Sequence, residues 1–527
     1  YLGSQYLLRS DNKGDSWQTI SPDLTTDDPE KQKQNKSGGL TIDNSTAENH
    51  CTIYTISESP KDANVVWAGT DDGNLQVTED GGASWTNVVK NIPGLPSNTW
   101  CSSVEASSHD RATAYATFDG HRHGDKKTYF YKTSDMGKSW QSLATDAIEG
   151  YALDVKEDPV SRNLLFLGTE FGLYVSVDGG QQWARFTGNL PKVGIREIAI
   201  HPREADVILA THGRGIMIID DITPLREITP EVLASDVYIL HSRPSTISIP
   251  AGVQQFNAND QFVGQNPSEV ATISYYLKKR HIFGDMKVEI HDPAGKLVKT
   301  LAGGKRRGIN RVDWAMRKRA PRVPRAATLA FGAMFGPMVD PGAYTVKVVK
   351  GDKSYEGELE IIHDPKYAHS VADRNLQQQT VMKLYNMQEH LAYIAEATTS
   401  ARDQAKKLAE GRKKGDGLAK DLKAFADKLD TFHKTLVATR QGGFITGEEQ
   451  LRERLTTLYA SVSGYAGKPT QSELDRMSAL GTELGKAETQ FKSLMSKDLP
   501  AINKKLEKKK LAAIEVASEE EFREKQQ

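Results

Sequence analysis

The sequence has little cysteine, almost no net charge and no long apolar run. Only two of its 527 residues are cysteine, which excludes a small disulfide-rich scaffold. Lysine plus arginine number 68 against 69 for aspartate plus glutamate, so the formal charge of -1 gives no global attraction to nucleic acid or anionic membranes. No run of about 18 apolar residues is present, so no membrane-spanning helix is predicted. The length allows roughly three or four domains with sizeable cores.

Motifs of several common enzyme classes are also missing. The sequence contains no glycine-rich phosphate-binding loop, no His-Glu-x-x-His and no Gly-x-Ser-x-Gly. The sequence therefore gives no motif support for a nucleotide-dependent enzyme, a zinc protease or a serine hydrolase. We expect neither a cofactor nor a bound metal.

An eight-residue motif recurs between Ser10 and Trp183. Its pattern is Ser/Thr-x-Asp-x-Gly-x-x-Trp, with an asparagine in the Asp position of the first copy. The short polar side chain can hydrogen-bond the backbone of a tight turn, glycine accepts positive φ, and tryptophan packs the hairpin onto its neighbour. We therefore predict structural turns, and no catalytic or metal-binding role, for the repeated positions: Asn12, Gly14, Trp17, Asp80, Gly82, Trp85, Asp135, Gly137, Trp140, Asp178, Gly180 and Trp183.

The repeat is longer than this motif. Residues 54–85 align with residues 153–183, with proline, asparagine and Gly-Thr pairs at matching positions. Four short strands in a unit of about 40 to 50 residues indicate a blade of a β-propeller. A fifth copy, residues 198–222, lacks the motif and is predicted to be the last blade.

These repeats resemble the Asp-box (BNR) proteins, a group that includes sialidases, xyloglucanases, sortilin and a photosystem II assembly factor. A closer similarity, to bacterial sortilin-like Asp-box proteins often labelled "glycosyl hydrolase", is carried by segments 21–25, 48–50, 210–215, 308–314 and 340–346. The resemblance implies a propeller fold and an exported protein of the periplasm, cell surface or medium. It implies no reaction, because no catalytic signature defines that set.

The beginning of the sequence falls inside a blade. Residues 1–4 align with residues 67–70, in the second strand of a blade. About four and a half blades are then present, whereas closed propellers typically have more. We expect an upstream segment of the same polypeptide, continuous or nicked, to complete the ring.

The two cysteines fall near the starts of neighbouring innermost strands. In the repeat alignment Cys101 matches Tyr54 rather than Cys51. This three-residue offset makes a disulfide possible but not favoured.

The binding mouth of a propeller usually lies on the face opposite the repeated turn, at the connections between blades and between the second and third strands. The insertion at residues 21–50 also lies there. The predicted mouth residues are Gln5, Tyr6, Asp71, Asp72, His121, Arg122, His123, Asp125, Glu170, Phe171, His212 and Arg214.

Within this mouth, the candidates for ligand binding are the cationic residues His121, Arg122, His123, His212 and Arg214. A loop with two histidines and no nearby third ligand is more often solvated than metal-bound.

A glycosidase would need two carboxylates about 5 Å or roughly 6.5 to 9.5 Å apart. Asp72, Asp125 and Glu170 are weak catalytic candidates, since no spacing proves a pair. A sialidase would also need a cluster of arginines, for which this sequence offers only two candidates.

The residue pattern changes twice in the remainder of the chain. Short alternating apolar runs separated by Asp-Pro and glycine turns predict an antiparallel β-sandwich, which also resembles immunoglobulin-like appendage domains. Its long loop, residues 317–338, is basic and then apolar, and we expect it to contact another domain or a partner rather than nucleic acid. The predicted domains are blades at 1–222, a connector at 223–250, the sandwich at 251–365 and a helical bundle at 366–527.

The C-terminal composition is rich in Ala, Leu, Lys, Glu and Gln and predicts an up-down bundle of four comparable helices. Thr446 with Glu449 and Thr470 with Glu473 have the spacing of capping boxes. The last ten residues are predicted to be a frayed tail. The expected helices span 370–410, 416–440, 447–465 and 470–509.

Two functional hypotheses follow. The first is an exported, non-enzymatic protein whose propeller binds a peptide, a protein or a glycan, with the sandwich and bundle as docking modules. The second is a glycoside hydrolase of the Asp-box group. A rigid ring of loops without a recognised catalytic motif favours the first.

Overall fold

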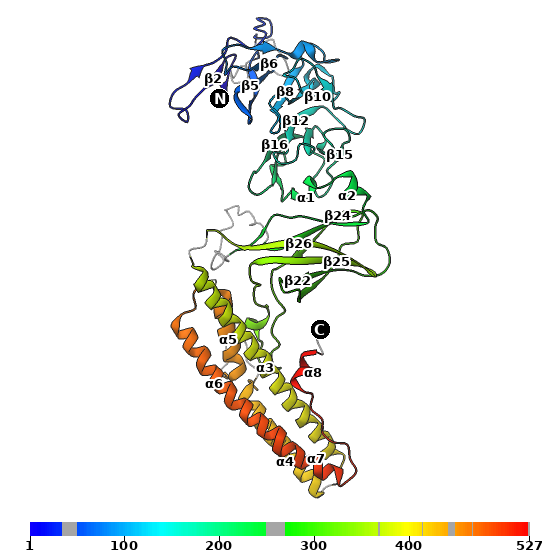
Figure 1. Ribbon diagram of the computed structural model, residues 1–527, viewed down its shortest axis with the longest axis vertical. Helices are drawn as coiled ribbons and strands as arrows, with labels where there is room; N and C mark the ends of the chain where they lie inside the picture. The colour runs from blue at the N-terminus through cyan, green and yellow to red at the C-terminus, as the bar shows by residue number, and fades with distance from the viewer. Residues whose placement is uncertain are drawn as a thin grey trace. The chain divides into compact units, whose positions relative to one another are not determined.

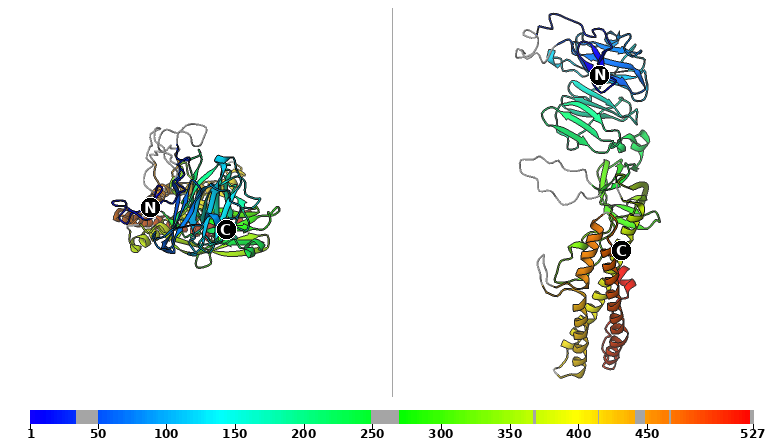
Figure 2. Two further views of the ribbon diagram at one scale, coloured as in Figure 1. Left: turned by 90° about the horizontal axis from the view of Figure 1, so that it is seen from above. Right: turned by 90° about the vertical axis from the view of Figure 1, so that its left-hand side faces the viewer.

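The chain forms two compact units in a computed structural model (Figure 1, Figure 2). The first unit comprises residues 1–243, 274–280 and 306–309, and the second comprises residues 244–273, 281–305 and 310–527. The structure describes residues 1–33, 50–248, 269–366, 369–413, 415–440, 448–465 and 467–524.

The first unit begins with five consecutive antiparallel sheets, in each of which the strands follow chain order. We call each sheet a blade. This succession supports the predicted propeller-like β architecture, with a three-stranded last blade. The strands are β1 (Leu2–Gly3), β2 (Leu7–Arg9), β3 (Gln18–Thr19); β4 (Ile53–Ser59), β5 (Asp62–Thr70), β6 (Leu75–Thr78), β7 (Thr86–Asn87); β8 (Trp100–Ala106), β9 (Ala114–Asp119), β10 (Tyr129–Thr133), β11 (Gln141–Ser142); β12 (Ala152–Glu157), β13 (Leu165–Thr169), β14 (Gly172–Ser176), β15 (Ala184–Arg185); and β16 (Ile195–Ile200), β17 (Val207–Thr211), β18 (Ile216–Ile219).

Blades pack face to face through their middle strands. Every residue of β9 and β13 is buried, because both faces of these strands are covered by neighbouring blades. Trp67 on β5, for example, shares one apolar core with Phe118 on β9 and Trp140 after β10. The two cysteines are free and buried, Cys101 within this core.

The predicted turns join β2 to β3, β6 to β7, β10 to β11 and β14 to β15. In the second copy, Asp80 accepts hydrogen bonds from the Ser84 backbone N–H at 2.9 Å and from the Ser84 hydroxyl at 2.6 Å. The Gly82 N–H donates to Thr78 Oγ1 at 3.0 Å. Gly82 has φ 104°, and a Cβ there would collide with the Ile20 carbonyl of the preceding blade. The motif therefore satisfies its polar groups within its own turn.

The region predicted as a connector contains regular structure. Two short helices, α1 (Thr223–Arg226) and α2 (Pro230–Ala234), precede β19 (Val237–Leu240). β19 pairs antiparallel with β21 (Ala271–Leu277), and a three-stranded sheet has the order β19-β21-β24, with β24 at Gly308–Trp314. Residues 249–268 of the predicted connector and sandwich lie outside the described residues.

The second unit contains a five-stranded sheet in the order β20-β26-β25-β22-β23. Its strands are β20 (Ser245–Ile247), β22 (Met286–His291), β23 (Leu297–Ala302), β25 (Gly342–Lys350) and β26 (Lys353–His363). The alternation predicted for one wet face is confirmed, since Val288, Val346 and Leu359 are buried while their neighbours in sequence are more exposed. The pairs β22–β23, β22–β25 and β25–β26 are antiparallel, and β20, which lies in the region predicted as a connector, pairs parallel with β26.

Helices follow the sheet, and α3 to α7 contribute to one apolar core. They are α3 (Val371–Glu410), α4 (Gly417–Leu436), α5 (Leu451–Gly464), α6 (Gln471–Ser493), the π-helical turn η4 (Leu494–Asp498), α7 (Leu499–Glu507) and α8 (Glu519–Glu524).

Each of the four predicted spans contains a helix, but the helices are not comparable in length, since α3 has 40 residues and α5 has 14. α4 and α5 both pack on the 40-residue α3, and α6 continues through η4 into α7 (Figure 1). The Thr470–Glu473 capping box is confirmed. Thr446 lies outside the described residues, and α5 begins instead at Leu451 with a capping box formed by Gln450 and Glu453.

The long loop between β24 and β25 packs on these helices, as expected for a domain contact. Arg322 lies 2.9 Å from Glu389 of α3, and Thr328 donates to Glu453 of α5 at 2.8 Å. The 3-10 turn η3 (Phe331–Ala333) also contacts α5. For residues 518–524 the expectation of a frayed tail is wrong, because Phe522 of α8 is buried and the Arg322 guanidinium lies 3.8 Å from the centre of its ring, whereas residues 525–527 lie outside the described residues.

Candidate functional site

A β-bulge occurs at the same place in the first strand of four blades. In β4, Ile53 pairs with Thr70 and Thr55 pairs with Gly69, which leaves Tyr54 as the extra residue. The same shift in β8, β12 and β16 makes Ser102, Leu153 and Arg196 the extra residues. A bulge re-aims its side chain and often lies next to a functional site.

All four bulge residues line one small pocket of about 70 Å³. They are joined there by Trp100 and Asp119 and by two residues of the 3-10 turn η2 (His121–His123). We call this site the bulge pocket, lined by Tyr54, Trp100, Ser102, Asp119, His121, Arg122, Leu153 and Arg196.

The aromatic wall of the bulge pocket is made by two rings and a guanidinium. Tyr54 meets Trp100 edge to face with ring centroids 4.6 Å apart, and Tyr54 is 54% exposed. Arg122 stacks over Trp100 with its guanidinium carbon 4.3 Å from the ring centroid. The Trp100 indole N–H is buried and has no hydrogen-bond partner within the described part of the chain.

A histidine forms the other wall. His121 Nδ1 lies 2.7 Å from the Asp119 carboxylate, and its ring stacks on Tyr151 with centroids 4.5 Å apart. Burial, followed by the negative charges of Glu170 and Asp119, raises the pKa of Tyr151, so its hydroxyl stays protonated. His121 is therefore held by an acid and an aromatic ring, and its orientation is fixed.

Only part of the predicted cationic set meets at this pocket. His121 and Arg122 line it, whereas the exposed His123, His212 and Arg214 are not among its lining residues.

The predicted catalytic carboxylates do not form a pair in the pocket. Asp72 is 1% exposed and accepts from the Thr26 N–H and hydroxyl, each at 2.6 Å, so its prediction as a mouth acid is wrong. Despite burial, hydrogen bonds hold the pKa of Asp72 below its usual value. Asp125 accepts from the Tyr129 hydroxyl at 2.6 Å, which lowers the pKa of Asp125. Glu170 is half-buried and does not line the pocket.

The other predicted mouth residues lie in the loops around the blades, where most of them contact neighbouring loop residues. Asp71 accepts from the Thr52 N–H at 2.8 Å, and Lys192 lies 4.6 Å from the centre of the Phe171 ring. The Gln5 carbonyl accepts from the Leu24 N–H, and Tyr6 is 41% exposed. Residues 34–49 of the predicted insertion lie outside the described residues.

Sequence reasoning missed six of the lining residues, among them Trp100 and Arg196. The usable signal was the repeat itself, since Tyr54, Ser102, Leu153 and Arg196 occupy equivalent positions in successive blades. Strand alternation alone assigns them to a blade face, because it does not reveal an inserted residue.

Among the described residues, no three His, Cys, Asp or Glu side chains gather as metal ligands. Within the same residues, no helix is long and apolar enough to cross a bilayer.

Comparisons with known proteins add fold-level likenesses. A scan against protein-family models gave no match, and neither did a search of curated proteins. Similar solved structures include a GH74 enzyme from Niastella koreensis, with 20% identity, a TM-score of 0.26 and coverage of 32% of this chain and 23% of that one. YCF48 bound to D1 peptide has 13% identity, a TM-score of 0.24 and coverage of 58% and 81%. YCF48 from Cyanidioschyzon merolae has 16% identity, a TM-score of 0.23 and coverage of 59% and 84%.

The chain spans less than a quarter of the length of the GH74 enzyme. The propeller-like assignment of the first unit therefore rests on its own strand order and on the packing of its blades.

Proposed function

We propose that the first unit is a non-enzymatic binding module whose bulge pocket recognises an acidic segment of a peptide or protein. The observation that carries this proposal is the stacking of Arg122 on Trp100 beside the exposed Arg196. Two arginines at one opening attract carboxylates and can hold them with paired hydrogen bonds.

The charge balance of the bulge pocket supports an anionic ligand. Among the described residues that line it, Arg122 and Arg196 are cationic and Asp119 is the one acid. Asp119 already faces His121 at 2.7 Å, so its charge is largely directed at that ring. The opening therefore has a cationic excess with an aromatic edge.

The same geometry favours a peptide over a neutral glycan. Sugars bind proteins largely by stacking on open aromatic faces, and Arg122 covers one face of Trp100.

The alternative function, a glycoside hydrolase, has weaker support. A glycosidase acid needs a raised pKa, and hydrogen bonds lower the pKa values of both Asp72 and Asp125.

The same proposal includes export from a bacterial cell, an Asp-box and sortilin-like ancestry, and docking through the sandwich and the helices. The four turns with shared hydrogen bonding support the Asp-box part.

Binding of a blocked peptide of alternating glutamate and alanine, followed by tryptophan fluorescence, tests the proposal. The glutamine-alanine peptide is the neutral control. Arg122→Gln and Arg196→Gln should each weaken glutamate-peptide binding by about tenfold, since a charge-assisted pair contributes on the order of 1.5 to 3 kcal/mol. Lys138→Gln, which removes an exposed cation at a repeated turn, should leave binding unchanged.

Equal affinity for both peptides, or equal loss in the Lys138 variant, would contradict the acidic-peptide function. Release of reducing sugar from polysaccharides or sialosides, abolished by Glu170→Gln, would establish the hydrolase instead.

A further inference from the structure

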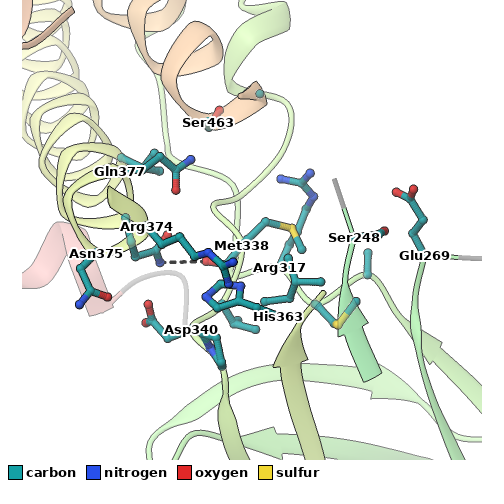
Figure 3. A pocket seen from close by; sticks show the side chains of 18 residues that line it. Ser248, Glu269, Arg317, Met338, Asp340, His363, Arg374, Asn375, Gln377 and Ser463 are labelled. Atoms are coloured by element: carbon teal, nitrogen blue, oxygen red, sulfur yellow. Dashed lines mark hydrogen bonds between the residues drawn. The ribbon is translucent and has the colours of Figure 1, made fainter. Parts of the chain in front are cut away.

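A second cavity lies wholly within the second unit, where the loop after β24 and the end of β26 meet the first turns of α3. Its volume is about 290 Å³, near the lower end of the range for small-molecule sites. The buried side chains of Met316, Val339 and Val381 give it an apolar floor. We call it the α3 cavity (Figure 3).

Two arginines from different parts of the chain line the α3 cavity. Arg317 comes from the loop after β24, and its Nη1 donates to the Gly336 carbonyl at 2.9 Å. This hydrogen bond holds the guanidinium in place. Arg374 comes from the first turns of α3, and Figure 3 shows its guanidinium beside the ring of His363. One cationic side chain from a helix and one from a loop therefore line the cavity together with its apolar floor.

The histidine in this cavity is kept neutral. Burial, and then the charge of Arg374, lower the pKa of His363, whereas the charge of Asp340 opposes this shift. A neutral imidazole adds a hydrogen-bonding group without a further charge.

The acids of the α3 cavity lie at its rim. Asp340 is 60% exposed and lies 3.7 Å from the Lys318 ammonium. Glu269 is exposed as well. Both carboxylates face solvent, which weakens the ion pairs that they can form.

A strained residue holds the cavity wall in shape. Met316 has φ 52°, a left-handed conformation that is uncommon for a residue other than glycine. Its carbonyl accepts from the Val339 N–H at 2.9 Å, and the Trp314 indole donates to the Arg317 carbonyl at 3.2 Å. Such strain persists where the surroundings fix it, and it is concentrated at ligand sites.

We propose that the α3 cavity binds a small monocarboxylic acid with an apolar body. The carboxylate pairs with Arg374 and Arg317, and the hydrocarbon part covers Met316, Val339 and Val381. The site is independent of the bulge pocket, which lies in the other unit.

Titration of the full chain with three probes tests this site. Hexanoate supplies both the carboxylate and the apolar body, hexanamide lacks the charge, and acetate lacks the body. Hexanoate should saturate one site and bind at least about tenfold more tightly than either control, as expected when charge pairing and apolar burial both contribute. Equal binding of hexanoate and hexanamide, or no saturation by hexanoate, would overturn the proposal.

Variants then locate the binding. Arg374→Gln should weaken hexanoate binding by about tenfold or more, and Arg374→Lys should weaken it less because the charge is retained. Arg476→Gln, at an exposed position of α6, is the matched control and should bind as the parent chain does.

Arg317→Gln also removes the contact with the Gly336 carbonyl, so its melting temperature is measured first. Unchanged hexanoate affinity in a folded Arg374→Gln chain would place the binding elsewhere and overturn the assignment.

Discussion

The polar side chains at the two ends of a blade differ in hydrogen bonding and in exposure to solvent. At the turn end, the Asp or Asn side chain of the repeated motif accepts hydrogen bonds within its own turn, as the carboxylate of Asp135 does from the N–H and hydroxyl of Ser139 at 2.9 and 2.6 Å. At the bulge end, Tyr54 and Arg196 are exposed to solvent. The turn end is built for stability, and the bulge end is available for binding.

This difference separates two kinds of repetition in one sequence. A repeated residue whose hydrogen bonds are satisfied internally maintains the blade. A repeated backbone feature that presents a different side chain in each blade, Tyr54, Ser102, Leu153 and Arg196, produces an asymmetric site on a symmetric frame.

The largest expected effect on stability comes from truncating a buried tryptophan at the turn end. Trp140 is 7% exposed and meets Trp67 edge to face, so Trp140→Ala should lower the free energy of unfolding by about 3 to 5 kcal/mol. Trp17 occupies the same place in the first motif but is 44% exposed, and Trp17→Ala should cost less than about 1 kcal/mol. Urea denaturation of both variants checks the difference, and equal losses would contradict it.

The half-buried Trp85 should give an intermediate loss. Its indole N–H donates to the Ile20 carbonyl of the preceding blade at 3.0 Å.

The next effect concerns a contact between blades near the turn end of their strands. Burial raises the pKa of Glu105 to about 7, although Lys156 of the neighbouring blade lies 2.7 Å away. The unfolded chain releases this proton at a lower pH than the folded chain, so stability falls as pH rises from about 4.5 to about 7. The fall is at most about 3 kcal/mol for a shift of this size.

Denaturation at several pH values, compared with Glu105→Gln, isolates this group. The parent chain should lose its advantage over the variant as pH rises. A constant difference between the two chains would show that Glu105 does not titrate in this range.

A smaller effect tests the internal bonding of the turn. Asp135→Ala removes the acceptor for Ser139 and should cost about 1 kcal/mol, as for the loss of a helix cap. Asp135→Asn should cost less, because Asn12 already makes the equivalent bond to the Ser16 N–H at 3.0 Å in the first motif.

Thermal melts of Asp135→Ala and Asp135→Asn rank the two changes. The Asp135 pKa lies below its usual value because of Ser139, so the contribution of the carboxylate persists above its unfolded pKa and is lost as pH falls through the lower folded value.

The sequence predicted the turn end well and the bulge end poorly, for physical reasons. Turn chemistry is local, so the residue types of the Thr78-to-Trp85 copy were enough to predict its hydrogen bonds. A bulge depends on the register between two strands, which residue types alone do not specify. Asp72 was misassigned for a similar reason, since its partner Thr26 is 46 residues away in sequence.

The helices show the same limit. The ends of α3 were predicted within one residue, because composition and helical periodicity are local properties of the sequence. The packing of both α4 and α5 against α3 depends on contacts between helices, and helical periodicity carries no such information.

The variants with the smallest expected change in stability test the difference between the turn end and the bulge end most directly. Arg196 is exposed at a bulge, so Arg196→Gln should change the free energy of unfolding by less than about 0.5 kcal/mol. Tyr54→Ser should also have a small effect, because Tyr54 is 54% exposed and loses mainly its edge contact with Trp100. If the bulge end is a binding surface, these two variants keep the melting temperature of the parent chain and lose affinity for the acidic peptide. Asp135→Ala should do the reverse, with lower stability and unchanged affinity. A bulge variant that unfolds as readily as Trp140→Ala would show that the bulges hold the blades together, and the division between the two ends would then be wrong.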